Sequence, residues 1–138
     1  MKKRILALDV GDVRIGLALS DPMQIIASPL ETYTRKNIEA DIEYIRNIVE
    51  SKDVGEIVSG LPLSMSGNEN EQVKKTKEFI EKLKEVVFVP ITLFDERLTS
   101  VSAEEMLIDA DVKRKDRKKV IDKIAASIIL NDYLRSKE

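Results

Sequence analysis

The fold is decided by the stretch Ile5-Leu6-Ala7-Leu8-Asp9-Val10-Gly11-Asp12-Val13-Arg14-Ile15-Gly16-Leu17-Ala18-Leu19-Ser20-Asp21. Two apolar runs flank Gly11-Asp12, a dipeptide that favours a tight turn, so the stretch predicts a β-hairpin. With these two residues as the loop, Asp9 faces Arg14 and Gly16 faces Ala7. A carboxylate on a buried strand is costly to desolvate, so Asp9 requires a cation, a partner or a proton.

The composition limits the chemistry that the chain can perform. Its 138 residues suit one domain spanning 1–138, and its 43% hydrophobic and 35% charged residues are typical of a globular protein with many surface charges. The chain has no Cys and no His, which excludes thiol chemistry, an imidazole base and His-ligated metals. A net charge of -2 gives no general attraction to nucleic acid, so such a site must be a local patch. The sequence shows neither a signal peptide nor an apolar run long enough to span a bilayer, and we expect no membrane association and a cytoplasmic protein.

The remaining chain alternates short apolar runs with segments of helical periodicity. Strands are expected over 23–34, 56–60 and 86–94, and helices over 38–52, from a capping box at Asn68 and Glu71 to about 85, over 100–110, and over 117–134. We therefore predict an α/β fold with a mixed five-stranded sheet. Three antiparallel strands come first, parallel βα units extend the sheet, and helices cover both faces.

Three carboxylates interrupt the apolar pattern. Asp9 ends the first strand, and Glu96 follows the last strand, at the kind of sheet edge where α/β proteins bind ligands. Asp122 falls on the helical face that also carries Ala126 and Ile129, so it is aimed at the core or at a cleft beside it. All three are candidates for one shared site.

Each carboxylate also has a purely structural interpretation. A strand-end carboxylate is commonly solvated or caps a helix, and for Asp95 we favour this role or a supporting role beside the site, together with Arg97. Asp122 can form an ion pair with Arg14 or Arg97. Two arginines do not satisfy three inward carboxylates, whereas Mg²⁺ or Mn²⁺ does. We expect two such ions, held by Asp9, Glu96 and Asp122, to support displacement at a phosphodiester.

A basic run precedes the Asp122 helix: Lys113-Arg114-Lys115-Asp116-Arg117-Lys118-Lys119. Without a binding function, such a run is usually a solvated, disordered loop. Placed beside the carboxylates, however, Lys113, Arg114, Lys115, Arg117, Lys118 and Lys119 are candidates for holding a phosphate backbone. Arg14 is a candidate phosphate contact or a structural cross-strand partner, and Gly11 and Gly16 leave room for a backbone to approach the hairpin.

The motifs together resemble one family. They are Leu8-Asp9-Val10-Gly11 with Arg14-Ile15-Gly16 and Ser20-Asp21, Gly60-Leu61-Pro62-Leu63 with Gly67, Asp95-Glu96-Arg97-Leu98-Thr99, and Asp122-Lys123-Ile124-Ala125-Ala126. In this order they resemble the YqgF/RuvX family of bacterial proteins, described as Holliday junction resolvase-like and as candidate pre-16S rRNA nucleases. The resemblance implies a ribonuclease H-like fold, catalytic Asp9, Glu96 and Asp122, and an active-site loop that includes Gly11, Gly60, Pro62 and Gly67.

Three functions remain open. The first is a metal-dependent nuclease that processes the 5′ end of the 16S rRNA precursor, with the ribosome or its precursor as a partner. The second is a junction resolvase acting on branched DNA, which requires two paired active sites and hence a dimer; the sequence leaves a monomer and a weak homodimer open. The third is a non-catalytic assembly factor that binds nucleic acid. An actin-like ATPase or sugar kinase, which shares the opening motif, needs a second domain for which 138 residues leave no room.

Overall fold

The computed structural model describes residues 3–63, 70–95 and 114–137, with residues 114–120 described by their backbone only. Five strands and three helices make up this part of the chain. In chain order they are β1 (Arg4–Val10), β2 (Arg14–Ser20), β3 (Ala27–Thr34), α1 (Ile38–Ser51), β4 (Val54–Leu61), α2 (Glu71–Lys84), β5 (Ile91–Asp95) and α4 (Arg114–Ser136).

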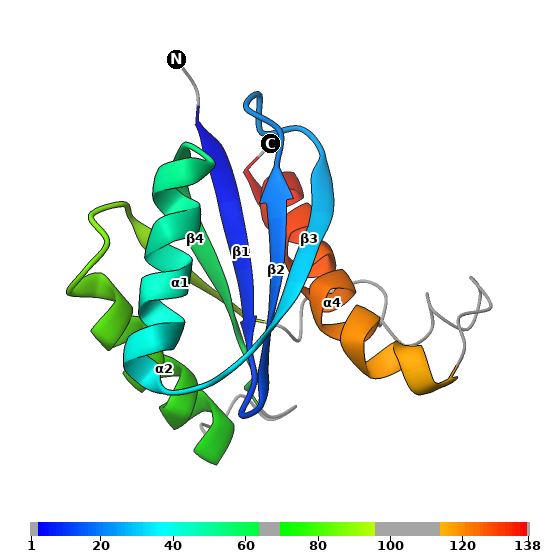
Figure 1. Cartoon of the computed structure of the whole chain (residues 1–138). Coiled ribbons are helices and arrows are strands. Elements are labelled where there is room, and N and C mark those ends of the chain that lie inside the picture. Colours follow the sequence, from blue (N-terminus) through cyan, green and yellow to red (C-terminus); the bar gives the residue numbers. More distant parts are fainter. Residues whose placement is uncertain (1–2, 64–69, 96–113, 138) are drawn as a thin grey trace.

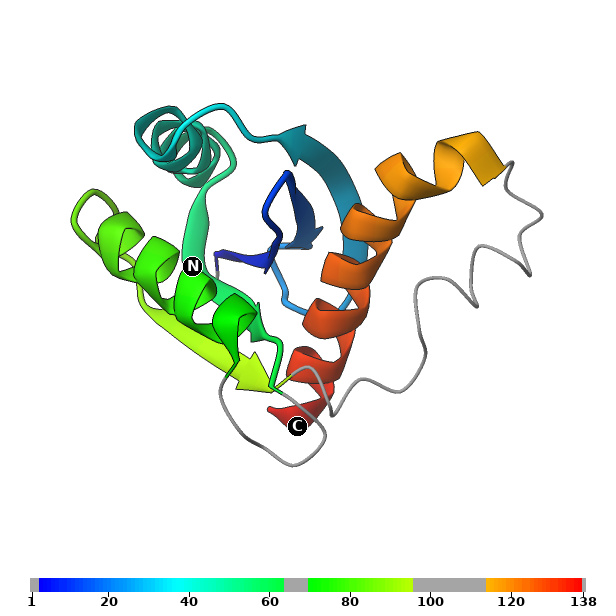
Figure 2. The ribbon, with the colours of Figure 1, turned by 90° about the horizontal axis from the view of Figure 1, so that it is seen from below.

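The strands form one mixed sheet in the order β3-β2-β1-β4-β5. β1, β2 and β3 pair antiparallel, and β4 and β5 extend the sheet parallel to β1. Helices α1 and α2 cover one face, and α4 crosses the other (Figure 1; Figure 2). The predicted mixed five-stranded sheet with helices on both faces is confirmed.

Alternation along the strands separates two cores. On the first face, β1 contributes Leu6 and Leu8, which pack with Ile45 of α1 and Phe79 of α2. On the second face, β1 contributes Ile5 and Ala7, which pack with α4. Because successive strand residues point to opposite faces, any β1 residue of odd number, Asp9 included, lies on the α4 face. Small residues line this second face, which lets the helix approach the sheet.

The hairpin forms, but its turn lies one residue later than predicted. Val10 pairs with Ile15 and Asp9 with Gly16, so the loop residues are Asp12 and Val13. Gly11 stays in the ladder, where its N–H donates to the Arg14 carbonyl at 2.9 Å. Asp9 therefore faces Gly16 instead of Arg14. Because each residue's cross-strand partner changes by two positions, every side chain stays on the face of the sheet where it was expected.

Tertiary contacts explain this register. Arg35, in the connection from β3 to α1, donates from its N–H to the Val13 carbonyl at 2.9 Å and from its side chain to the Gly11 carbonyl at 2.9 Å. These two bonds hold both sides of the turn from outside the hairpin. Local turn preference could not reveal them, because Arg35 lies in another segment.

Several predicted boundaries shift for local reasons. The third strand begins at Ala27 instead of residue 23, because Asp21 accepts hydrogen bonds from the backbone N–H groups of Ile25 and Ile26 and closes a loop. The fifth strand begins after Pro90, which lacks the N–H of a ladder residue. Asn70, not Asn68, caps α2 by accepting from the Val73 N–H at 2.9 Å.

Of the two other described helices, α4 starts earlier than predicted and α1 starts where predicted. α4 begins at Arg114, three residues before the predicted start at Arg117, so the basic run from Arg114 onward is helical. α1 begins at the predicted cap, where Asn37 accepts from the Ala40 N–H at 2.8 Å. The helix expected over 100–110 lies outside the described residues. Among those that are described, no helix is long and apolar enough to cross a membrane.

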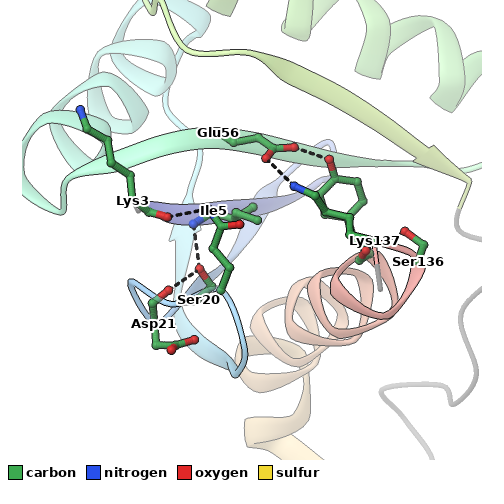
Figure 3. Close-up of polar contacts among 9 residues, drawn as sticks. Lys3, Ile5, Ser20, Asp21, Glu56, Ser136 and Lys137 are labelled. Carbon is green, nitrogen blue, oxygen red and sulfur yellow. Dashed lines mark hydrogen bonds and ion pairs between the residues drawn. The ribbon is translucent and has the colours of Figure 1, made fainter. Parts of the chain in front are cut away.

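The C-terminal end of α4 is attached to β4 by polar contacts (Figure 3). The Tyr133 hydroxyl donates to Glu56, and Lys137 Nζ lies 3.1 Å from the second oxygen of the same carboxylate. Burial of the ring, followed by its bond to Glu56, raises the pKa of Tyr133. At the same end of the sheet, the Ile5 N–H donates to the Ser20 hydroxyl at 2.8 Å (Figure 3). The contacts of Tyr133 and Lys137 with Glu56 fix the C-terminal end of α4 along the second face.

A buried carboxylate that the sequence did not single out links α1 to the hairpin. Asp41 is 1% exposed, and it accepts hydrogen bonds from Tyr33 at 2.9 Å, Arg35 at 2.8 Å and the Lys36 N–H at 3.0 Å. Burial alone would raise the pKa of Asp41, but these donors and the Arg35 charge outweigh it and hold the pKa below its ordinary value. Since Arg35 also holds the Gly11 carbonyl, Asp41 indirectly supports the turn that follows Asp9.

Asp41→Asn is expected to lower the free energy of unfolding by about 2 kcal/mol at neutral pH, because it breaks a mostly buried ion pair whose Arg35 keeps some solvent contact. A carboxyl with a lowered folded pKa stabilises the protein above its unfolded pKa of about 3.9 and loses that contribution as the pH falls through the folded value. Urea denaturation at pH 7, 5 and 3 should show the difference from wild type shrinking below about pH 4. An equal difference at all three values would contradict the ion-pair explanation.

Candidate active site

The carboxyl ends of the three parallel strands meet at one edge of the sheet. Leu8 pairs with Ser59, which puts Asp9 one step further along, level with Gly60. Gly60 in turn pairs with Phe94, and Leu61 with Asp95. The register thus brings the end of β1, the end of β4 and the end of β5 to the same edge, as the sequence predicted.

Asp9 is positioned by strand alternation. It shares the α4 face with Ile5 and Ala7, and its side chain is half-buried, whereas both neighbours Leu8 and Val10 are buried. A half-buried carboxylate at the end of a core strand is held rigidly by the sheet and still reaches solvent. This combination suits a ligand-binding carboxylate better than the fully buried charge that the sequence suggested.

Gly16 brings α4 onto this carboxylate. A Cβ atom added to Gly16 would lie 1.8 Å from the backbone carbonyl oxygen of Asp122 and 2.2 Å from its carbonyl carbon. Only a residue without a side chain permits this approach of helix and strand. Since Gly16 pairs directly with Asp9, whose Cα lies about 5 Å away in such a pair, the backbone of Asp122 packs on the glycine that is the strand partner of Asp9. The close approach expected at Gly16 is made by the helix, not by a phosphate backbone.

Asp122 is engaged by Arg14. The Arg14 Nε lies 2.6 Å from Asp122 Oδ2, and the two side chains are 32% and 22% exposed. The structural alternative for Asp122, an ion pair with Arg14, is therefore present. It uses one carboxylate oxygen and one guanidinium N–H, and it fixes the side chain of Asp122 at the same edge as Asp9.

The third predicted ligand, Glu96, lies outside the described residues, as does Arg97. Among residues 3–63, 70–95 and 121–137, no cluster of three or more acidic, His or Cys side chains could hold a metal. The two predicted aspartates that are described offer carboxylate oxygens, which are the ligands that Mg²⁺ and Mn²⁺ prefer. Their chemistry fits such an ion, and their placement at one glycine fits a shared site.

The other predicted site residues are distributed around this edge. Gly60 and Pro62 lie at and just after the end of β4, and the Pro62 carbonyl accepts from the Asn70 side chain at 3.0 Å. Asp95 ends β5 and, by alternation, shares the face of Ile91 and not that of Phe94. Gly67 is outside the described residues. The roles of these residues stay predictions.

The basic run continues from the site along α4. The N-terminal half of this helix extends beyond the sheet on the β3 side in both ribbon views (Figure 1; Figure 2). It contains Arg114, Lys115, Arg117, Lys118 and Lys119, whereas Lys113 lies outside the described residues. The positions closest to Asp122 lie one helical turn from it.

Sequence reasoning missed a polar pocket of about 380 Å³ beside the aspartates. It is lined by Arg14, Leu30, Glu31, Thr32, Thr34 and Lys123. Alternating threonines at the end of β3 were the available signal, because residues 32 and 34 must share one face. Without the register of β3 against Gly16 and Arg14, that face could not be assigned to the α4 side.

Comparisons with known proteins point to one family. The sequence model of the RuvX family, described as Holliday junction resolvase, matches residues 3–136. A protein of Desulforamulus reducens is 50% identical over 133 residues, which cover 96% of this chain and 97% of that protein. One of Halothermothrix orenii is 47% identical over 131 residues, with 95% and 94% covered. Both relatives are named as candidate pre-16S rRNA nucleases.

Solved structures agree with the fold. Thermus thermophilus RuvC in complex with a Holliday junction substrate superposes with a TM-score of 0.65 at 12% identity, covering 98% of this chain and 95% of that one. The fowlpox virus resolvase in complex with Holliday junction DNA gives a TM-score of 0.59 at 10% identity, with 97% and 98% covered. At these identities the likeness establishes the ribonuclease H-like fold alone.

Proposed function

The chain belongs to the RuvX family, and on that premise we propose that it is a divalent-metal-dependent nuclease that processes the 5′ end of precursor 16S rRNA. The observation that carries this proposal is that Asp9 and Asp122 both adjoin Gly16, at the carboxyl edge of the sheet. The name shared by relatives about half identical over nearly the whole chain supports RNA as the substrate. Such a substrate places the protein in the cytoplasm, bound to the ribosome precursor.

The proposed division of labour follows from the described contacts. Asp9, Asp122 and Glu96 would hold Mg²⁺ or Mn²⁺, two ions in our proposal. When bound, such ions stabilise charge on the attacking and leaving oxygens of a phosphodiester. Arg14 orients the Asp122 carboxylate through its Nε. Rigid β1 and the close contact at Gly16 keep the two aspartates in place, so little reorganisation is needed when the substrate arrives.

The surrounding residues are proposed to hold the substrate. The basic positions of α4, with Lys113 before it, would contact backbone phosphates on the side of the site nearest β3. Gly11 at the β1–β2 turn and the segment of Gly60, Pro62 and Gly67 at the end of β4 would border the cleavage point, and Asp95 and Arg97 would support Glu96. The unequal placement of positive charge, in a chain of net charge -2, directs nucleic acid to this one edge.

The resolvase alternative is favoured by the description of the family. It requires two active sites that cut a junction together, and therefore a dimer. A non-catalytic assembly factor would bind the same RNA without cutting it. These functions differ in substrate and in metal requirement, so one assay separates them.

The test compares three substrates with the purified full chain: a 16S precursor fragment with its 5′ extension, a four-way DNA junction, and an unstructured RNA of equal length. Each is incubated with Mg²⁺, with Mn²⁺ and with a chelator. We expect metal-dependent cleavage of the precursor near the mature 5′ end. Paired cuts in the junction alone would favour the resolvase, and binding of the precursor without cleavage under any condition would favour the assembly factor.

A further inference from the structure

The polar pocket lies beside the proposed cleavage site, on the far side of Gly16 from Asp9. Gly16 pairs with Asp9 on one side and with Thr32 on the other, so the three residues form one row across β1, β2 and β3. At the usual strand spacing, Thr32 lies about 10 Å from Asp9 along this row. The next row on the same face of the sheet holds Arg14 paired with Thr34. The pocket is therefore adjacent to the aspartates but does not include them.

The groups that line the pocket suit an anion. Arg14 uses its Nε for Asp122, which leaves further N–H donors of its planar group. Lys123, next to Asp122 on α4, forms no ion pair within the part of the chain that the structure describes. The Thr34 hydroxyl adds a neutral donor to this set. The acidic member, Glu31, accepts the Tyr44 hydroxyl of α1, on the opposite face of the sheet.

The position of the pocket selects the kind of anion. On one side it adjoins Asp9 and Asp122, and on the other it adjoins the N-terminal half of α4, which carries the basic run and projects past β3 (Figure 2). The pocket thus lies between the aspartates and the N-terminal half of α4, on the path of a strand that contacts both. Its volume of about 380 Å³ accommodates a backbone phosphate with part of the sugars that flank it.

We propose that the pocket of Arg14, Thr32, Thr34 and Lys123 binds a phosphodiester of the substrate strand that neighbours the one being cleaved. This inference rests on the proposed function and adds a second anchoring point to it. Lys123 supplies the charge, Arg14 shares its guanidinium between Asp122 and the phosphate, and the Thr34 hydroxyl donates to a phosphate oxygen. Two fixed phosphates define the direction of the strand across the site.

The test measures binding without cleavage. A fluorescein-labelled 12-nucleotide RNA is titrated with the full chain in chelator, and the dissociation constant is followed by anisotropy from 50 to 200 mM KCl. Lys123→Gln should weaken binding roughly 5-fold and reduce the slope of log affinity against log salt by about 0.7, the value for one phosphate contact on a single strand. Thr34→Val should weaken binding about 3-fold through one lost neutral hydrogen bond.

The matched control is Lys82→Gln, which removes the same charge from the exposed surface of α2 on the other side of the sheet. It should leave both the affinity and the slope near wild type. Equal effects of Lys82→Gln and Lys123→Gln would overturn the pocket assignment. The DNA of the same sequence should show the same relative loss, because the phosphate is common to both; a loss confined to RNA would overturn a phosphate site in favour of 2′-hydroxyl recognition.

The outcomes of these experiments distinguish the pocket assignment from the proposed nuclease function on which it rests. If wild type cleaves precursor RNA while Lys123→Gln binds as tightly as wild type, the pocket assignment is wrong and the nuclease stands. If the variants weaken binding but no metal supports cleavage, the pocket stands and the nuclease is wrong. If wild type binds no nucleic acid, both are wrong.

Discussion

Asp9→Asn is expected to lower the rate of phosphodiester cleavage by at least about 10³-fold, which corresponds to roughly 4 kcal/mol of transition-state stabilisation. The substitution keeps the shape of the side chain and removes the negative charge that would hold a divalent cation. Asp9 is half-buried at the end of β1, so the amide can be accommodated and the fold should persist. Single-turnover cleavage in Mn²⁺, together with thermal unfolding, measures the two effects separately.

Asp122→Asn should give a similar loss, but it also weakens the ion pair with Arg14. The double variant Asp122→Asn/Arg14→Gln separates the two contributions. If the ion pair were the only role of Asp122, adding Asp122→Asn to Arg14→Gln would cause almost no further loss of cleavage. Asp12→Asn is the matched control: it lies in the same turn region, its side chain is 58% exposed, and its contact with Lys75 is long, at 3.4 Å. It should cleave within about 2-fold of wild type. Full activity in Asp9→Asn or Asp122→Asn would refute the carboxylate mechanism.

Gly16→Val should lower the free energy of unfolding by roughly 3 kcal/mol or more and the melting temperature by about 10 °C. The obstructing atom is the backbone carbonyl of Asp122, which cannot rotate away as a side chain could. The helix must therefore withdraw from β2, which also separates Asp122 from Asp9. Amide exchange should accelerate along α4 more than along α1, and cleavage should be lost with it.

Two comparisons make this prediction specific. Gly11→Ala, whose added Cβ would lie 2.9 Å from the Arg14 carbonyl, should cost less, about 1 kcal/mol. Truncating the side chain in Asp122→Ala should not restore the stability of Gly16→Val, because the clash is with backbone. Rescue by that truncation, or a near-native Gly16→Val, would show that helix and strand are not locked together at this point.

The fold was predictable because the hydrophobic pattern changes period along the chain. Alternating or continuous apolar runs mark the strands, and α1 shows helical spacing behind the cap at Asn37. The positions of turns were harder to predict, because they depend on contacts from elsewhere. Arg35 sets the β1–β2 turn from outside the hairpin, and Asp21 closes the loop before β3 with its own side chain.

Members of the candidate site were predictable where a charged residue interrupts an apolar sequence pattern. Asp9 interrupts an apolar strand and Asp122 an apolar helical face, and in the structure both residues adjoin Gly16. What could not be predicted were relations between elements: Arg14 pairing with Asp122, and Thr32 and Thr34 facing Lys123. Such relations require the register of β2 against β3 and the docking of α4, neither of which is encoded in a local pattern.

The contact between Gly16 and Asp122 has a consequence for the order of biosynthesis. It joins the first hairpin to the last helix, so Asp9 leaves the ribosome long before the segment that completes its site. A nascent chain that has exposed β1 to β5 but still holds α4 in the exit tunnel has no Asp122 beside Asp9. The proposed site is thus completed only once α4 has emerged from the exit tunnel and can dock on β2.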